Sequence, residues 1–272
     1  MHWFSRKALR RAAQQGALAL LAAVAAAPAG AFDPQHLERV KDTKACERCD
    51  LSGAPLEKAD LAGARLAGAN LAGARFAGAN LVKADLRGAD LTEADFERAA
   101  LQEAELTGAN MQRASFVAAI LSGAKMSRAD LRFAVLREAV LTDADLTEAK
   151  LEQAYLVKAD LSGAILAGAD LTAVTARDVR LYRARLPMAV LRRAELWGAD
   201  LRKAELTGAD LREANLRAVD LVGADLTRAQ IGGADLKNSC ICNTIMPDGR
   251  TDVSGCRACN RPPAPGTGEA PR

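Results

Sequence analysis

Residues 59–81 read ADLAGARLAGANLAGARFAGANL, and this stretch decides the fold. A large apolar residue returns at every fifth position, with Ala two positions before it. Followed outward, the period runs from Leu51 to Leu236 through 38 consecutive units without an insertion or deletion. Leu fills 31 of the large positions, and Ala fills 34 of the small ones. An internal period this strict takes precedence over every other sequence signal.

A period of five matches neither an α-helix nor a β-strand, whose side chains repeat every 3.6 and 2 residues. The pattern requires a turn every five residues, with one large and one small side chain pointing inward. Phe76, Phe96 and Phe116 are 20 residues apart, which indicates that they form a vertical core ladder with four units per coil. At ~4.8 Å between stacked strands, about 9.5 coils would give a rod ~45 Å long.

The repeat at residues 49–238 resembles the pentapeptide repeat family, whose consensus is A-[DN]-L-x-x. The resemblance implies an all-β fold: a right-handed quadrilateral parallel β-helix, or solenoid, of about nine to ten coils with short terminal caps. It also implies that the Leu/Phe position and the small residue two before it point inward. The other three positions of each unit would then face solvent.

Residues 1–31 have the layout of a signal peptide. They contain Arg6, Lys7, Arg10 and Arg11 but no acid, then an apolar run at 16–27 and an A-x-A pattern at 29–31. We expect cleavage after Ala31 and an exported protein, periplasmic or secreted, with no transmembrane segment; an uncleaved anchor is the alternative. Without this segment the chain has 33 basic and 34 acidic side chains, a balance unsuited to general nucleic-acid binding.

The flanking segments are expected to close the rod, because stacked strands leave open edges at both ends. Residues 32–48 form an N-terminal cap, partly helical over 34–43 with Asp33 as N-cap. Residues 239–259 form a Cys-rich C-terminal cap loop. Residues 260–272, rich in Pro and Gly, are expected to be a disordered tail.

All six cysteines lie at the two ends of the repeat. An even number in an exported chain indicates disulfides, although six cysteines allow 15 pairings. The segment CNTIMPDG followed by SGC resembles the tail of exported family members, in which such a pair brackets a closing loop. We expect Cys46–Cys49, Cys242–Cys256 and Cys240–Cys259. The alternatives are a zinc site made by the last four cysteines and a redox role for the first two.

Ala176 interrupts the core ladder, because it stands where a large residue is expected. Val174 and Val179 replace the usual Ala and are expected to refill part of the space. The period continues from Leu171 to Leu181, so the sequence predicts a local bend or a distorted coil within one domain.

A basic outward patch follows, and it is a candidate site for an anionic partner. Trp197 lies between Arg177 and Arg217 in one column of the 20-residue register, where guanidinium stacking on the indole is expected. The alternative is a solvated face whose arginines pair with Asp200, Glu195 and Glu205. The patch comprises Arg177, Arg180, Tyr182, Arg183, Arg185, Arg192, Arg193, Trp197 and Arg217.

A second outward patch is apolar and is a candidate protein interface, since clustered exposed apolar side chains mark such sites. Lateral packing between stacked coils is the alternative. The patch comprises Val117, Ile120, Val135, Val140, Tyr155 and Val157.

Catalytic signatures are not found in the sequence. His36 is the single histidine after residue 31, and the serine-hydrolase, zinc-protease and phosphate-loop motifs do not occur. We therefore expect a non-enzymatic rod without cofactor or metal, which serves as a scaffold for an unknown protein or envelope partner. Its oligomeric state is left open. Some family members mimic DNA and bind topoisomerases; that alternative is disfavoured by the near-zero charge and the signal. A metal-binding or redox module is the third hypothesis.

Overall fold

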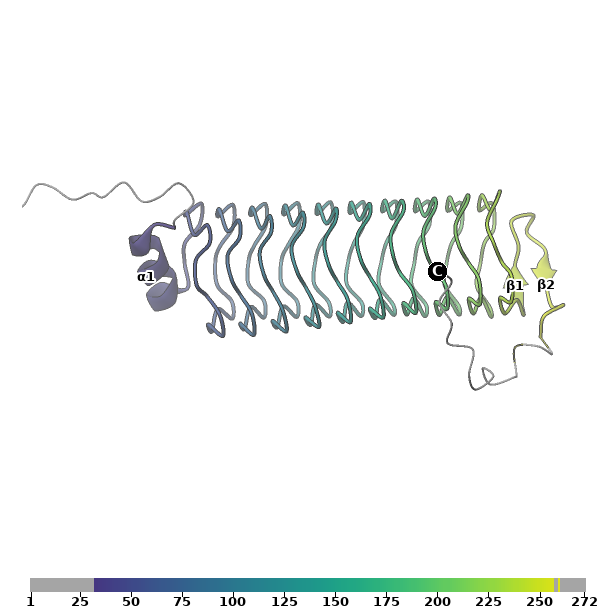
Figure 1. Cartoon of the computed structure of the whole chain (residues 1–272), viewed down its shortest axis with the longest axis horizontal. Coiled ribbons are helices and arrows are strands. Elements are labelled where there is room, and N and C mark those ends of the chain that lie inside the picture. The colour runs from purple at the N-terminus through teal and green to yellow at the C-terminus, as the bar shows by residue number, and fades with distance from the viewer. Residues whose placement is uncertain (1–31, 257–258, 260–272) are drawn as a thin grey trace, which may run out of the picture. The chain divides into compact units, whose positions relative to one another are not determined.

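The structure, a computed structural model, describes residues 32–256 and residue 259. The expected signal peptide and the expected tail at 260–272 lie outside the described residues. The named elements are α1 (Pro34–Thr43), β1 (Thr244–Ile245) and β2 (Thr251–Asp252). Between α1 and β1 the chain winds through regular, stacked turns (Figure 1). In the described part, no helix is long and apolar enough to cross a bilayer.

Isolated parallel bridges hold the turns together. They occur at every fifth residue and always join residues 20 apart, from Ala45↔Arg65 to Asp225↔Ile245. Twenty residues per coil means four units per coil, so each coil has four sides. The bonding is regular: Leu51 N–H donates to the Asn70 carbonyl at 2.8 Å, and Asn70 N–H donates to the Cys49 carbonyl at 2.8 Å. Stacking therefore satisfies the backbone of each coil through its neighbours.

The turn that closes each unit has a left-handed residue two positions after the large one. Gly63 has φ +65°, and non-glycine residues adopt the same conformation elsewhere, for example Lys58 at 55°. Glycine enters this region without steric cost, which explains the recurring Ala-Gly-Ala sequence. The turn itself is closed by a short bond, such as Ala64 N–H to the Leu61 carbonyl at 3.0 Å.

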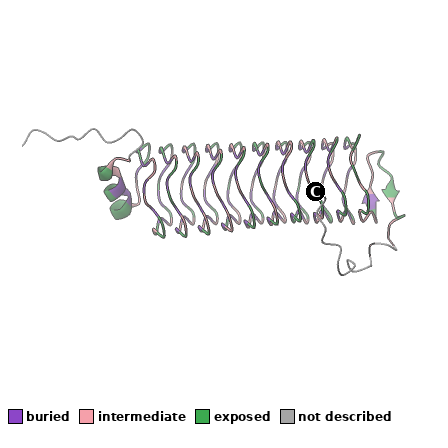
Figure 2. Ribbon diagram, viewed as in Figure 1, coloured by how far each residue is buried: buried purple, intermediate pink, exposed green. Residues whose placement is uncertain are grey.

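The core is a continuous column inside the coils. The rings of Phe76 and Phe96 are parallel within 3°, and those of Phe96 and Phe116 within 2°; the centroids lie 4.8 Å apart in both pairs. The vertical ladder predicted from the spacing is thus confirmed. Every large inward residue from Leu51 to Leu226 is 3% exposed or less. Figure 2 shows buried positions recurring in each coil.

At its first coil the rod is covered by α1. The Asp33 side chain accepts the Gln35 N–H at 2.8 Å, as an N-cap does, and Leu37 and Val40 are buried. The Asp33 N–H donates to the Asp50 carbonyl at 3.2 Å. His36 Nδ1 lies 3.1 Å from the Asp50 nitrogen and accepts its N–H. The cap therefore gives Asp50 the two backbone contacts that a preceding coil would otherwise supply.

At the other end, the repeat extends beyond the expected boundary at residue 238. Bridges continue through Asp220↔Cys240 and Asp225↔Ile245. Ser239 and Thr244 take the small positions, and Ile241 and Met246 take the large ones. The five-residue period therefore continues in the sequence, but polar residues replace the usual Ala. The chain then turns back, and β2 pairs antiparallel with β1, drawn in yellow in Figure 1.

Of the two outcomes expected near Ala176, a bend or a distorted coil, the stacking bonds show no bend, and the distortion is confined to the turns. Thr175 keeps its bridges to Tyr155 and Glu195, and the stacking bonds continue on both sides. Only the turn bonds lengthen: Val179 N–H to the Ala176 carbonyl is 3.4 Å, against 3.0 Å for Ala164 to Leu161. Val174 and Val179 are 0% and 1% exposed. Their methyl groups thus widen the turn locally, and the coil stays in register.

Candidate functional site

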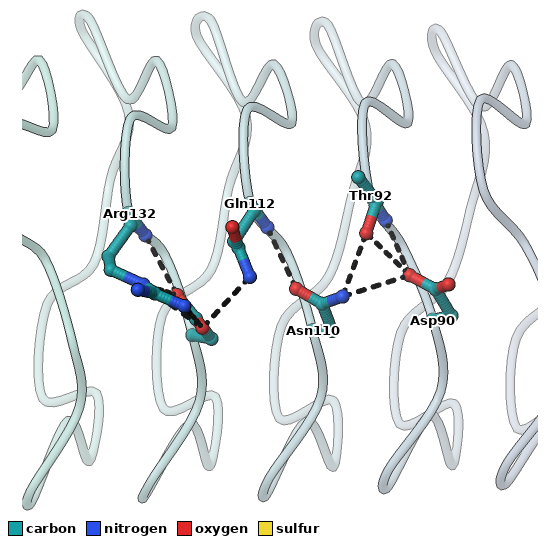
Figure 3. Close-up of polar contacts among 6 residues, drawn as sticks. Asp90, Thr92, Asn110, Gln112 and Arg132 are labelled. Carbon is teal, nitrogen blue, oxygen red and sulfur yellow. Dashed lines mark hydrogen bonds and ion pairs between the residues drawn. The ribbon is translucent and has the colours of Figure 1, made fainter.

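Outward polar side chains form ladders along the rod (Figure 3). Asn110 Nδ2 donates to Asp90 Oδ1 at 3.2 Å and to Thr92 Oγ1 at 2.8 Å. One coil further, Gln112 Nε2 donates to Asp130 Oδ2 at 3.1 Å. These bonds join side chains of successive coils. The recurring Asp and Asn residues on this face are thereby explained as structural groups.

Several aspartates are held by the Arg two positions later. Arg87 Nη2 lies 2.7 Å from Asp85 Oδ2, and Arg202 Nη2 lies 2.6 Å from Asp200 Oδ2. The hydrogen bond from Arg87 lowers the pKa of Asp85. Burial raises the pKa of Asp200, but the bonds from Arg202 outweigh it, so that pKa is lowered too. Such carboxylates stay ionised near neutral pH, which does not suit them to donate protons as general acids.

Within the basic patch, three cations gather around one aromatic ring. The distances to the Tyr182 ring centroid are 5.1 Å from Arg183, 5.7 Å from Arg202 and 5.9 Å from Lys203. We call these four residues the cationic corner. Arg202 and Lys203 were missed by the sequence analysis, although the 20-residue register places them directly above Tyr182 and Arg183. In the described part of the chain, neither Arg183 nor Lys203 forms an ion pair with a carboxylate.

Most other arginines of the predicted patch are neutralised. Arg185 pairs with Glu205 at 3.2 Å, as the alternative interpretation expected. The other two expected acids are engaged elsewhere, because Asp200 holds Arg202 and Glu195 accepts a bond from Asn215. Four further pairs join adjacent coils: Arg180–Asp160, Arg192–Asp210, Arg193–Glu213 and Arg217–Asp235.

The stacking expected on Trp197 does not form. Backbone bonds confirm the column, because Asp178 N–H donates to the Trp197 carbonyl and Gly198 N–H to the Arg217 carbonyl. Among the described residues, however, no guanidinium lies over the indole, and Arg217 points toward Asp235 at 3.8 Å. Trp197 is 42% exposed. Charge–aromatic contact in this region is therefore concentrated on Tyr182.

The apolar patch has the predicted columns. Val135 bridges to Tyr155, and Ile120 bridges to Val140. Ile120 is 39% and Tyr155 50% exposed, whereas Val117, Val135, Val140 and Val157 are half-buried. Phe133, also 39% exposed, was missed; it occupies a turn position that usually holds Gly or a polar residue. An arginine, Arg113, covers part of its ring at 5.8 Å.

The cysteines form three disulfides: Cys46–Cys49, Cys240–Cys259 and Cys242–Cys256. Each joins Cα atoms 4.6–5.3 Å apart. This pairing leaves no thiolate at these positions for the alternative zinc site. Over residues 32–256 and 259, no group of three or more His, Cys, Asp or Glu side chains is arranged to hold a metal ion.

Comparison with protein families gives one match. The family described as pentapeptide repeats matches in eight copies between residues 49 and 246. Among curated proteins, no sequence matches this chain.

Solved structures give further matches. HetL, a pentapeptide repeat protein involved in heterocyst differentiation regulation from the cyanobacterium Nostoc sp., is 32% identical over 92% of this chain and 100% of its own, with a TM-score of 0.72. A pentapeptide repeat protein from the thylakoid lumen of Arabidopsis thaliana is 32% identical over 37% of this chain and 63% of its own, with a TM-score of 0.23. QnrB1, a plasmid-mediated fluoroquinolone resistance protein, is 20% identical over 61% of this chain and 88% of its own, with a TM-score of 0.34.

Proposed function

Because this chain belongs to the pentapeptide repeat family, we propose that it is an exported, non-catalytic rod that binds an acidic segment of a partner protein through the cationic corner. Proteins of this family are generally non-catalytic scaffolds. The observation that carries the proposal is the pair Arg183 and Lys203. Both approach the Tyr182 ring, and neither is neutralised by a carboxylate of the described chain.

The chemistry of the corner suits carboxylates. A guanidinium binds a carboxylate through two parallel N–H donors, and an ammonium adds a point charge beside it. Tyr182 offers an aromatic face with little conformational entropy to lose, and Tyr and Arg dominate the energetics of protein interfaces. A short run of Asp or Glu with an apolar residue therefore fits the corner. A DNA-mimic function would need a negative surface here, so we do not propose it.

Export is supported by the N-terminal pattern and by the disulfides. Stable disulfides are typical of oxidising compartments outside the cytoplasm. Cleavage after Ala31 would leave Phe32 as the first residue. The check is N-terminal sequencing of the protein recovered from the periplasm or medium; a chain that retains Met1 and stays with the cytoplasm contradicts export.

Binding is tested with a fluorescent acidic peptide of Glu, Asp and Leu, measured by anisotropy against a Lys-rich peptide of equal length. The double variant Arg183→Glu, Lys203→Glu is expected to weaken binding of the acidic peptide by about tenfold or more, since each charge contact is worth about 1 kcal/mol or more. The matched control is Arg98→Glu, Lys158→Glu, which reverses two cations at the same left-handed turn position on another side.

Two further results decide the proposal. A photoreactive residue at position 182 should crosslink, in the exported fraction, to a partner segment of net negative charge identified by mass spectrometry. Equal weakening by both double variants would reduce the effect to general charge, and crosslinking only to neutral or basic segments contradicts the proposal.

A further inference from the structure

One side of the rod carries an unusual run of uncharged outward residues. Its first column contains Asn80, Ala100, Ile120 and Val140, which bridge to one another in that order. The residues two positions after each of these, at 82, 102, 122 and 142, are Val, Gln, Ser and Thr. We call these eight positions the neutral strip. Single uncharged columns occur elsewhere on the rod, but on the other three sides at least one of the two equivalent columns carries a charge within any four successive coils. Four successive coils with both columns uncharged therefore distinguish this side.

The strip is bounded by charges in a symmetric way. Asp60 precedes it and Asp160 follows it in the first column. At its turn edge, Lys83 lies beside the first coil of the strip and Asp143 beside the last. The Asp60–Asp160 pair and the Lys83–Asp143 pair are both centred on the same level of the rod, between Ala100 and Ile120. Residues equidistant from that level carry opposite charges at the turn edge, Lys83 and Asp143.

We propose that the neutral strip is the contact between two copies of this chain, packed side by side and antiparallel. A two-fold interface requires a surface that complements itself, so that residue i meets residue j and j meets i. An axis across this face, midway between Ala100 and Ile120, places Ala100 against Ile120 of a second copy. The same axis brings each Lys83 to the Asp143 of the other chain.

The remaining pairs agree with this register. Gln102 meets Ser122, Val82 meets Thr142 and Asn80 meets Val140, so that no charge is buried at the centre. Glu103, which already pairs with Lys83 of its own chain at 3.4 Å, meets Gly123 and therefore no like charge.

The limits of the strip do bring like charges together, because Asp60 of one copy meets Asp160 of the other. Each already has its own cation: Lys44 lies 2.7 Å from Asp60, and Arg180 lies 3.7 Å from Asp160. The repulsion at the limits is thereby reduced, and the complementary pairs at 83 and 143 set the register.

The interface is small. Four coils stacked ~4.8 Å apart span roughly 14 Å from the first to the last, so the contact buries much less than the ~800 Å² per partner of a typical stable complex. A weak dimer follows, populated at high protein concentration. The ends of the rod are closed by α1 and the disulfide-linked hairpin, which leaves the sides as the surfaces on which copies can meet.

The test is sedimentation equilibrium of the purified protein from about 1 µM to 1 mM. The wild type is expected to pass from monomer to dimer within that range. Ile120→Asp, at the centre, should weaken dimerisation by about a hundredfold, since it places a charge in a desolvated contact. Ile165→Asp is the matched control, because Ile165 takes the same outward position on another side, and it should dimerise like the wild type.

The register is tested by charge reversal. Lys83→Glu and Asp143→Lys should each weaken self-association by about tenfold or more, because each creates two like-charge contacts in a homodimer. Mixed together, the two variants should associate with each other, since the reversed charges then complement across the axis. Circular dichroism melts check that all variants fold. A wild type that stays monomeric at every concentration overturns the proposal, and so does a dimer whose dissociation constant is unchanged by these substitutions.

Discussion

Phe96 lies parallel to Phe116, with ring centroids 4.8 Å apart and an angle of 2° between the planes. Phe76 extends the stack on the other side of Phe96, so the middle ring contacts an aromatic ring above and below. Because this spacing is also the distance between coils, the stack joins three coils through the core as the backbone bonds join them along the wall.

Phe96→Ala is therefore expected to destabilise the rod by about 3–5 kcal/mol, since both neighbours lose their contacts and a cavity remains. Phe96→Leu should cost less, about 1–2 kcal/mol, because Leu56 and Leu136 already fill the same column. Thermal unfolding followed by circular dichroism checks the order. A Phe96→Leu variant that melts at the wild-type temperature would show that the ring stack contributes little beyond filling the space.

The coil at Ala176 gives a second prediction about packing. Ala176→Leu restores the usual residue but is expected to destabilise by about 1–3 kcal/mol, because Val174 and Val179 already occupy the space. Adding Val174→Ala and Val179→Ala should recover that loss. The comparison is made by urea unfolding of the single and triple variants. A single variant more stable than the wild type would mean that a cavity remains at this level.

These core positions were predictable from the sequence because an integer period of 20 carries each residue to the same side of the next coil. Phe76, Phe96 and Phe116 could be placed from numbering alone, as could α1 from Asp33 and Pro34. Contacts of long outward side chains were not predictable in this way. Arg202 lies within reach of both Asp200 and the Tyr182 ring and contacts both. The 20-residue register placed Trp197 correctly between Arg177 and Arg217, but the predicted stacking of these arginines on the indole was wrong.

The last repeat units were missed for a related reason. Ser239 and Thr244 replace the small Ala, and their hydroxyls donate to the carbonyls of Leu216 and Leu221. Polar residues that satisfy themselves in this way can enter a core position, and a pattern search for Ala does not find them.

Acid should weaken the rod through the Asp–Arg pairs. The hydrogen bond from Arg212 lowers the pKa of Asp210, and that from Arg87 lowers the pKa of Asp85. A carboxylate with a lowered folded-state pKa stabilises the fold above its unfolded value, about 3.9, and this stabilisation is lost as the pH falls through the folded-state pKa.

Melting temperature is therefore expected to fall below about pH 4. Asp210→Asn should be less stable than the wild type at neutral pH and closer to it in acid. Parallel curves for the two proteins over the whole pH range would show that this pair contributes nothing. Asp248→Asn, in the exposed hairpin turn, is the control.

The disulfides should differ in importance according to the length of chain that each closes. Cys240–Cys259 and Cys242–Cys256 span 19 and 14 residues, whereas Cys46–Cys49 spans 3. In the chain-entropy account a loop of about 15 residues gives about 3 kcal/mol, and a shorter loop gives less. Cys242→Ser with Cys256→Ser should thus lower the melting temperature more than Cys46→Ser with Cys49→Ser. Limited proteolysis of the hairpin checks this locally, and the opposite order would contradict it.

His36 carries the last prediction, because its Nδ1 accepts the Asp50 N–H that has no preceding coil to bond with. His36→Ala should leave this amide without its protein partner, at a cost of about 1–3 kcal/mol if the site stays dry. His36→Asn is the matched variant, since the amide oxygen of Asn can take the place of Nδ1 and accept the same bond. Hydrogen exchange at the Asp50 amide separates the two: fast in the Ala variant and close to wild type in the Asn variant. If exchange at Asp50 is unchanged by His36→Ala, the cap does not act by replacing a coil, and α1 would protect the first coil only through the apolar cover that its own Leu37 and Val40 provide.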